Sequence, residues 1–268
     1  HLWVFLGCLT VLLSVQARFG AWSSEFGFHP DESAHYVTGV MVKEFVEGGW
    51  DRHPMRFAEQ YYVRYPRLAL GHWPPLFPAM LGGWMTLFGV GRFAVFFLLA
   101  LLGAGTATAL YALVRTEASA WWASGATVWW LLFERQTKLW ASSVMTEIPL
   151  TLFCLLALAA YIRYLQTESA RWSMLFGLAA GAALLTKGLG VTLAVVPPLA
   201  VFAAGRLELL RRWSFWAPAA VTTCIAGPWY GLQGSWIPTA FGGAWQRLTI
   251  ARMGGWEDRL AALTESLG

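Results

Sequence analysis

Charged side chains are scarce in this sequence. Only 13% of its 268 residues are Asp, Glu, Lys or Arg, whereas 57% are hydrophobic, and the mean hydropathy is +0.50. A composition this apolar argues against an ordinary soluble domain and predicts an integral membrane protein. The 17 tryptophans agree with this interpretation, because many of them fall near the ends of hydrophobic runs, where aromatic anchors meet the interface.

A strong excess of one sign of charge is also lacking. The formal net charge is +4, and the basic residues fall largely in short segments between hydrophobic runs. Such positions are typical of side chains that set the orientation of a membrane protein. We therefore expect membrane lipids, and no nucleic acid, among the partners.

Cysteine and several enzyme signatures are scarce or missing as well. The three cysteines, Cys8, Cys154 and Cys224, lie inside apolar runs without metal-ligand spacing, so we expect them to pack as small hydrophobic residues. The sequence contains no P-loop, dinucleotide-binding glycine motif, HExxH or GxSxG. No nucleotide site is therefore indicated.

Long hydrophobic runs, in contrast, are abundant. A helix needs about 20 apolar residues to cross the hydrocarbon core. Seven runs approach this length, at residues 2–17, 91–114, 119–136, 146–165, 172–186, 190–205 and 214–231. An eighth segment, 74–89, is short and contains three prolines and a glycine pair, so it either crosses the membrane or lies flat in the interface.

The distribution of arginine decides between these two arrangements. If 74–89 lies flat, six arginines share one side of the membrane, which the positive-inside rule makes cytoplasmic: Arg115, Arg163, Arg171, Arg206, Arg211 and Arg212. We therefore prefer seven spans, with residues 18–90 forming a large external loop. The expected fold is all-α, a polytopic transmembrane helix bundle over residues 1–231, followed at 232–268 by the start of an external segment.

The external loop is expected to contain amphipathic interfacial helices. Pro30 can start one helix, which the glycine pair at 48–49 would end, and a second would begin after Pro74-Pro75 and end at Gly89. The first helix has an apolar face able to lie on the membrane surface, formed by Val37, Val40, Met41 and Phe45. Because the chain starts at His1 without a methionine and ends just after a polar stretch, we expect it to be truncated at both ends.

The best place to look for chemistry is the acidic pair Asp31 and Glu32, at the start of this external helix. Adjacent helical residues point about 100° apart, so one carboxylate can face a cavity while the other faces water or a structural partner. The functional interpretation is a general base that deprotonates an incoming hydroxyl or amine. The alternative is that both acids only cap the helix N-terminus. His35, one turn away, is able to contact Asp31 or to be a polar interfacial residue.

Two further residues on the same side of the membrane are candidates for binding a divalent metal as a cofactor. Glu147 lies in SSVMTEIPL at the outer end of the fourth span, where it is either a helix-capping acid or, with Thr146 as the cap, a site residue. His72 precedes the 74–89 helix. Together with one more ligand, His72 and Glu147 are able to bind a divalent cation, although they come from distant segments.

Cations in the same regions suggest a site for phosphate. Lys187, in ALLTKGLG, lies between two short apolar segments that are able to form a wedge with its tip near the external face. Its ammonium group either reaches for the interface or holds a phosphate. Arg64 and Arg67, in YYVRYPRLALGH, are further candidates for the phosphate, or contacts of lipid headgroups.

The order of these motifs resembles one known family. The sequence has a span, an external loop opening with Asp31-Glu32, a PPL-initiated helix ending in FG, an Ala/Gly-rich span, an acid-x-Pro-Leu span start, LLTKG and PWY. From Asp31 to Tyr230 this order is similar to the GT-C superfamily of membrane glycosyltransferases. It resembles in particular the bacterial relatives of dolichyl-phosphate-mannose protein mannosyltransferases and the lipid A aminoarabinose transferases.

The resemblance implies a reaction and its place. A sugar carried on a polyprenyl phosphate is transferred to an acceptor, usually with inversion, at the periplasmic or extracellular side of a multi-pass protein of the bacterial inner membrane. It also implies that Asp31 is the base, that Glu32 is its neighbour in the motif, and that Glu147, His72 and Lys187 hold the later motif positions. The aminoarabinose transferases have Glu-Lys where this chain has His72-Trp73, and an Asp is common where it has Glu147. The metal and lipid-phosphate contacts are therefore open, as is the acceptor, whether glycolipid, polysaccharide or protein.

Other classes make different predictions. A secondary transporter or lipid flippase would place acids near the middle of spans and repeat broken helices, whereas the acids singled out here cluster at one face of the membrane. A noncatalytic scaffold would keep its function when Asp31 is replaced by Asn. An oligosaccharide ligase or polymerase would carry its large external loop late in the chain rather than after the first span.

Overall fold

A computed structural model describes residues 1–240 except 27–28, 50–52, 66–67 and 69–72. Within these residues every regular element is helical, which confirms the expected all-α class. The chain divides into two compact units, residues 1–227 and 228–268. The candidate site and all contacts that bear on it lie in the first unit.

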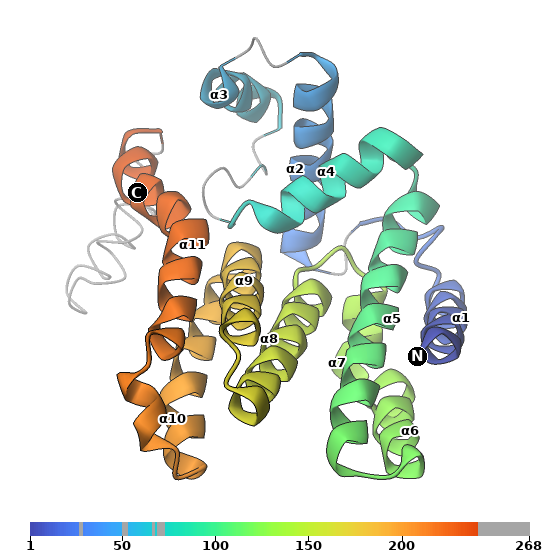
Figure 1. Cartoon of the computed structure of the whole chain (residues 1–268). Helices are drawn as coiled ribbons and strands as arrows, with labels where there is room; N and C mark the ends of the chain where they lie inside the picture. The colour runs from blue at the N-terminus through green and yellow to red at the C-terminus, as the bar shows by residue number, and fades with distance from the viewer. Residues whose placement is uncertain (27–28, 50–52, 66–67, 69–72, 241–268) are drawn as a thin grey trace, which may run out of the picture. The chain divides into compact units, whose positions relative to one another are not determined.

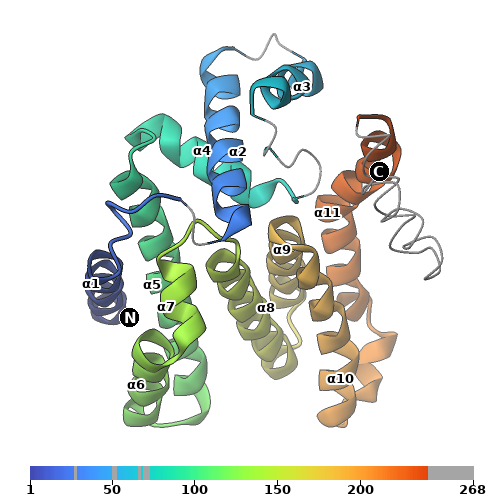
Figure 2. The same ribbon diagram turned by 180° about the vertical axis from the view of Figure 1, so that it is seen from behind.

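Residues 18–90, which were expected to form an external loop, contain three helices. They are α2 (Pro30–Glu47), α3 (Pro54–Arg64) and α4 (Leu76–Phe88). The predicted ends of α2 and α4 are confirmed, because Pro30 opens α2, Gly48 follows its last residue, and Gly89 ends α4 with a φ of 82°. Helix α3 has no counterpart in the sequence prediction. Figures 1 and 2 show α2, α3 and α4 gathered at one end of α5, α8 and α9.

The hydrophobic runs form the remaining helices. These are α1 (Leu2–Arg18), α5 (Arg92–Glu117), α6 (Ala120–Val128), α7 (Arg135–Ala141), α8 (Glu147–Thr167), α9 (Ala170–Thr186), α10 (Val196–Ala203) and α11 (Trp213–Ala240). Among the described residues, α5 and α8 are long and apolar enough to cross a membrane, and four further stretches are apolar but shorter: Leu2–Arg18, Leu76–Phe88, Ala170–Thr186 and Gly188–Ala203. The seven-span arrangement therefore stays a prediction.

Two expected spans are not continuous α-helices. The run 119–136 is α6, a π-helical turn at Trp129–Phe133, and α7, which begins after Glu134. Glu134 interrupts the run because its carboxylate accepts the amide N–H of Thr137 and so caps α7. The run 190–205 begins as a 3₁₀-helix, Gly188–Val195, before α10.

Glycine at position 190 allows this 3₁₀-helix to approach α9 closely. A Cβ atom at Gly190 would lie 2.5 Å from the backbone carbon of Ala183 and the backbone nitrogen of Leu184. Two apolar segments therefore turn back on each other around Lys187, as expected for a wedge. The final helix, α11, continues to Ala240, nine residues beyond its expected end.

Helix α2 packs on α4 through small residues. A Cβ atom at Gly39 would lie 2.8 Å from Leu81 side-chain atoms, and one at Gly82 would lie 2.6 Å from the Val42 side chain. The buried residues of α2 are three polar ones, Glu32, His35 and Thr38, and two small ones, Ala34 and Gly39. Its predicted apolar face, with Val37, Val40, Met41 and Phe45, stays partly exposed.

A buried glutamine ties α1 to two other helices. The Gln16 side chain is fully buried, and its Nε2 donates to the backbone oxygens of Phe96 in α5 and Ala141 in α7, each at 2.9 Å. The Trp22 indole N–H donates to its Oε1 at 3.3 Å. These bonds hold α7, and with it the segment that leads to α8, against α1 and α5.

Candidate active site

The first turn of α2 presents Asp31 to solvent. His29 precedes the helix in extended conformation, and its Nδ1 accepts the amide N–H of Asp31 at 3.2 Å. The same Nδ1 lies 3.5 Å from Asp31 Oδ2, a contact that is an ion pair only when the imidazole is protonated. His29 therefore does the capping, and the Asp31 carboxylate, with 37% of its side chain exposed, is available for other contacts.

One of the two acids was expected to face water or a structural partner. Glu32 is the acid that has a structural partner. Its side chain is 2% exposed, and Oε1 accepts the amide N–H of Val144 at 3.0 Å. Val144 lies in the turn between α7 and α8, three residues before Glu147. This bond therefore fixes the start of α2, where Asp31 lies, to the start of α8.

Glu147 and Lys187 form an ion pair that the sequence prediction did not foresee. Lys187 Nζ lies 2.6 Å from Glu147 Oε1, and both side chains are about three-quarters buried. Glu147 is the first residue of α8, and Lys187 follows the last residue of α9. Thr146 takes the N-cap position, but its side chain makes no capping hydrogen bond.

Several polar atoms beside this pair are buried without a hydrogen bond. They are Glu147 Oε2, Thr146 Oγ1 and Ser142 Oγ, all on the segment that Glu32 holds. Burying a polar oxygen without a partner costs about 1–3 kcal/mol. A buried polar atom without a partner calls for an explanation, and a catalytic role is one of those known.

Three segments distant in sequence thus meet at one place. Glu32 connects the Asp31 turn to the 142–147 segment, and Glu147 connects that segment to Lys187. Both views of the ribbon show the start of α2 beside the start of α8, and the end of α9 facing α2 and α4 (Figures 1 and 2). The arrangement combines the partly exposed Asp31 carboxylate with the Lys187 ammonium group, which is paired with Glu147 and about one-quarter exposed.

His35 takes part in packing rather than contacting Asp31. Its ring is 1% exposed and lies 4.6 Å from the ring of Trp73 and 5.5 Å from that of Phe77. Trp73 occupies the position at which the sequence departs from the aminoarabinose transferases. The backbone of Val144 and the ring of Trp73 are the site features that sequence reasoning missed, since neither residue type signals a role by itself.

Arg64, the other predicted phosphate ligand among the described residues, lies at a different surface. Arg64 ends α3 and lines a polar groove with Glu44, His53, Arg56, Phe57, Gln60, Tyr61 and Val63. Glu44 lies 13 residues beyond Asp31 in α2, which is about 20 Å along the helix axis. Burial, and after it the Glu44 carboxylate, raises the pKa of Tyr61 to about 12, so this groove presents a neutral phenol. Arg67 and His72 lie outside the described residues.

The expected metal site is not assembled within the part of the chain that the structure describes. No group of three or more His, Cys, Asp or Glu side chains there is placed to hold a metal ion. Glu147 has Oε1 on Lys187, and its Oε2 is buried without a hydrogen bond. A His72–Glu147 metal site stays a prediction.

Comparisons with known proteins are informative at the level of the family. A family model described as dolichyl-phosphate-mannose-protein mannosyltransferase matches residues 72–230. The match covers more than half of the chain and includes Glu147 and Lys187, whereas Asp31 and Glu32 precede it. No curated protein and no solved structure matches the chain.

Proposed function

The chain belongs to the dolichyl-phosphate-mannose-protein mannosyltransferase family of GT-C membrane glycosyltransferases, and from this premise we propose that it transfers a sugar from a polyprenyl phosphate to an acceptor. Proteins of this family are integral to the membrane. The proposed donor is polyprenyl-phosphate mannose, and the proposed place of transfer is the external face of the membrane.

Two contacts carry this proposal: the bond from Val144 to Glu32 connects the Asp31 turn to the start of α8, and the ion pair of Glu147 connects the start of α8 to Lys187. A polyprenyl phosphate keeps its tail in lipid and its phosphate at the interface, so the enzyme needs its polar groups at one end of the helix bundle. Helix α8 begins at this site with Glu147, and α9 ends there just before Lys187.

The proposed step is a displacement at the anomeric carbon. An acceptor hydroxyl attacks this carbon while its proton passes to the Asp31 carboxylate, which is the most exposed carboxylate of the site. The bond from the anomeric carbon to the phosphate oxygen breaks, and the polyprenyl phosphate leaves with an additional negative charge. Inversion at the anomeric carbon follows from attack opposite to the leaving group.

Lys187 is the proposed ligand of the donor phosphate. Its ammonium group would stabilise the charge that develops on the leaving phosphate, and Glu147 holds it in place beforehand. Glu32 acts here as a positioning residue, since its carboxylate is committed to the Val144 amide. Arg64, Arg67 and a divalent metal on His72 and Glu147 remain further candidates for the same phosphate. The acceptor is a glycolipid, a polysaccharide or a protein.

The test is sugar transfer in membranes that contain the protein. Polyprenyl-phosphate mannose labelled in the sugar is added, and label is measured in the glycolipid, polysaccharide and protein fractions, with membranes lacking the protein as control. The proposal predicts that label leaves the donor lipid and becomes covalently attached in one fraction. Label that crosses the membrane while still on its donor would instead support a flippase or transporter.

A further inference from the structure

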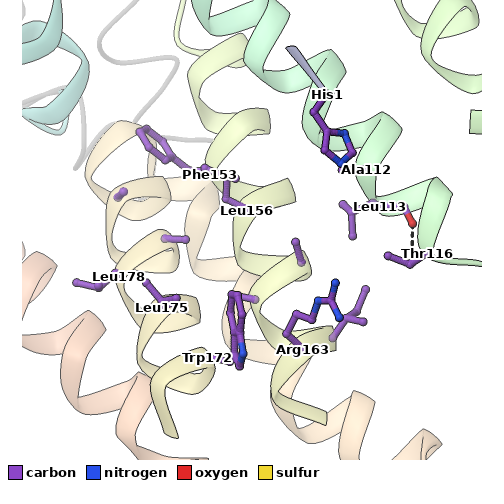
Figure 3. Close-up of a pocket in the computed structure, with 15 residues that line it drawn as sticks. His1, Ala112, Leu113, Thr116, Phe153, Leu156, Arg163, Trp172, Leu175 and Leu178 are labelled. Atoms are coloured by element: carbon purple, nitrogen blue, oxygen red, sulfur yellow. Dashed lines mark hydrogen bonds between the residues drawn. The ribbon is translucent and has the colours of Figure 1, made fainter. Parts of the chain in front are cut away.

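An apolar groove follows the outer face of α8 between α5 and α9. It has a volume of about 600 Å³, and Figure 3 shows its lining. Most lining side chains are aliphatic or aromatic, among them Phe153, Leu156, Ala159, Trp172 and Leu178. The groove lies against the two helices that are long and apolar enough to cross a membrane, so its expected surroundings are lipid.

One end of the groove is basic. Arg163 and Trp172 lie at this end, opposite Phe153 (Figure 3). Arg115 precedes Thr116, which also lines the groove, and the Arg171 guanidinium lies 5.9 Å from the centre of the Trp172 ring. None of these three arginines takes part in an ion pair among the described residues.

The carboxylates in this region do not balance the three arginines. Glu168, in the turn between α8 and α9, is held by Arg206 and Arg212. Glu117, next but one to Arg115, offsets one charge, which leaves an excess of positive charge at this end. These arginines belong to the set that the positive-inside rule assigns to the cytoplasmic side.

The polarity of the groove argues against the donor lipid as its occupant. Arg163 is 16 residues from Glu147 along α8, a separation of about 24 Å. A donor with its phosphate at Lys187 would place only uncharged chain near the arginines. The groove instead fits a lipid whose charged end lies at Arg163 and whose chain runs toward Phe153.

We propose that this groove is a binding site for an anionic phospholipid of the cytoplasmic leaflet. One acyl chain occupies the apolar groove, and the headgroup phosphate is bound by Arg163, with Arg115 and Arg171 adding to the attraction. Basic pockets between transmembrane helices on the cytoplasmic side are known to hold such headgroups. The proposal requires that the chain lies in a membrane but does not depend on sugar transfer.

The experiment measures lipid retention by the purified protein. The protein is exchanged into detergent with equal amounts of phosphatidylglycerol and phosphatidylcholine, and bound lipid is counted by native mass spectrometry. The proposal predicts that phosphatidylglycerol is retained preferentially. Arg163→Gln should lower its affinity about five-fold, since one basic side chain near an anionic headgroup contributes ~1 kcal/mol. Arg135→Gln, at an exposed arginine that begins α7, should leave it unchanged.

A second variant tests the apolar part of the groove. Ala159→Phe places a ring in the groove and should lower retention of phosphatidylglycerol at least five-fold, whereas Leu158→Phe, at the preceding residue, which does not line the groove, should not. Equal retention of the two lipids, or normal retention in Arg163→Gln, would overturn the proposal. A dimer that dissociates on Ala159→Phe would also overturn it, because a second copy of the chain would then be the occupant.

Discussion

At the scale of single residues, Asp31 and Glu32 are neighbours with different environments. The Asp31 side chain is partly exposed, and His29 caps the helix just before it. The Glu32 side chain is buried, and its carboxylate accepts the amide N–H of Val144. The sequence predicted that adjacent helical residues would diverge, because this follows from helix geometry. It was unable to say which acid would be buried, since that depends on a turn 112 residues away.

The role of Glu32 can be separated from that of a base. We expect Glu32→Gln to keep transfer within a few-fold of wild type, because its amide oxygen still accepts the Val144 N–H. Glu32→Ala leaves that buried N–H without its partner, which costs about 1–3 kcal/mol. It should lower both the melting temperature and the transfer rate. Thermal unfolding and initial rates measure the two effects, and a Glu32→Gln protein that is fully folded but inactive would make Glu32 a catalytic group.

The Glu147–Lys187 pair makes a prediction about coupling. Lys187→Met removes the proposed phosphate ligand and should raise the KM for the donor. Glu147→Gln should weaken donor binding less, because the lysine remains. In a double-mutant cycle on donor affinity, residues in direct contact usually couple by about 0.5–3 kcal/mol. Additive effects would show that the two side chains act independently, and Glu147 would then not be the group that holds Lys187 for the phosphate.

At the scale of elements, prolines and glycines predicted the ends of helices well, whereas apolar runs predicted the type of helix less well. Pro30, the glycine pair at 48–49, Pro75 and Gly89 mark the ends of α2 and α4 as predicted, because their backbone preferences act locally. Hydropathy carries no information on helical pitch, so the π-helical turn at Trp129–Phe133 and the 3₁₀-helix at Gly188–Val195 were not foreseen. Helix α3 was missed because its polar sequence forms no long hydrophobic run.

The contact between α2 and α4 is predicted to require glycine at position 82 but not at position 83. Gly82→Ala would bring a Cβ atom to 2.6 Å from the Val42 side chain, whereas a Cβ atom at Gly83 meets nothing within 4 Å. Overpacking of this kind costs about 1–3 kcal/mol. We expect Gly82→Ala to lower the melting temperature and slow transfer, and Gly83→Ala to do neither. Equal effects of the two changes would contradict the packing described for α2 on α4.

At the scale of the whole molecule, the all-α class and the family could be predicted, but the assembly of the site could not. Composition and the order of motifs depend on the sequence alone, and the family match over residues 72–230 agrees with them. The ion pair between Glu147 and Lys187 joins residues 40 positions apart at the ends of two helices. Their proximity depends on how α9 packs against α8, which no local pattern specifies.

The central claim is that this chain transfers a sugar with Asp31 as the base. The most direct test compares initial rates of transfer from polyprenyl-phosphate mannose for wild type, Asp31→Asn and Glu59→Gln at equal protein levels. Glu59 is an exposed acid on α3. Loss of a general base lowers a rate by about 10²–10⁴-fold, so Asp31→Asn should fall by this amount while Glu59→Gln stays near wild type. Transfer by Asp31→Asn within a few-fold of wild type would contradict this claim and place the base elsewhere.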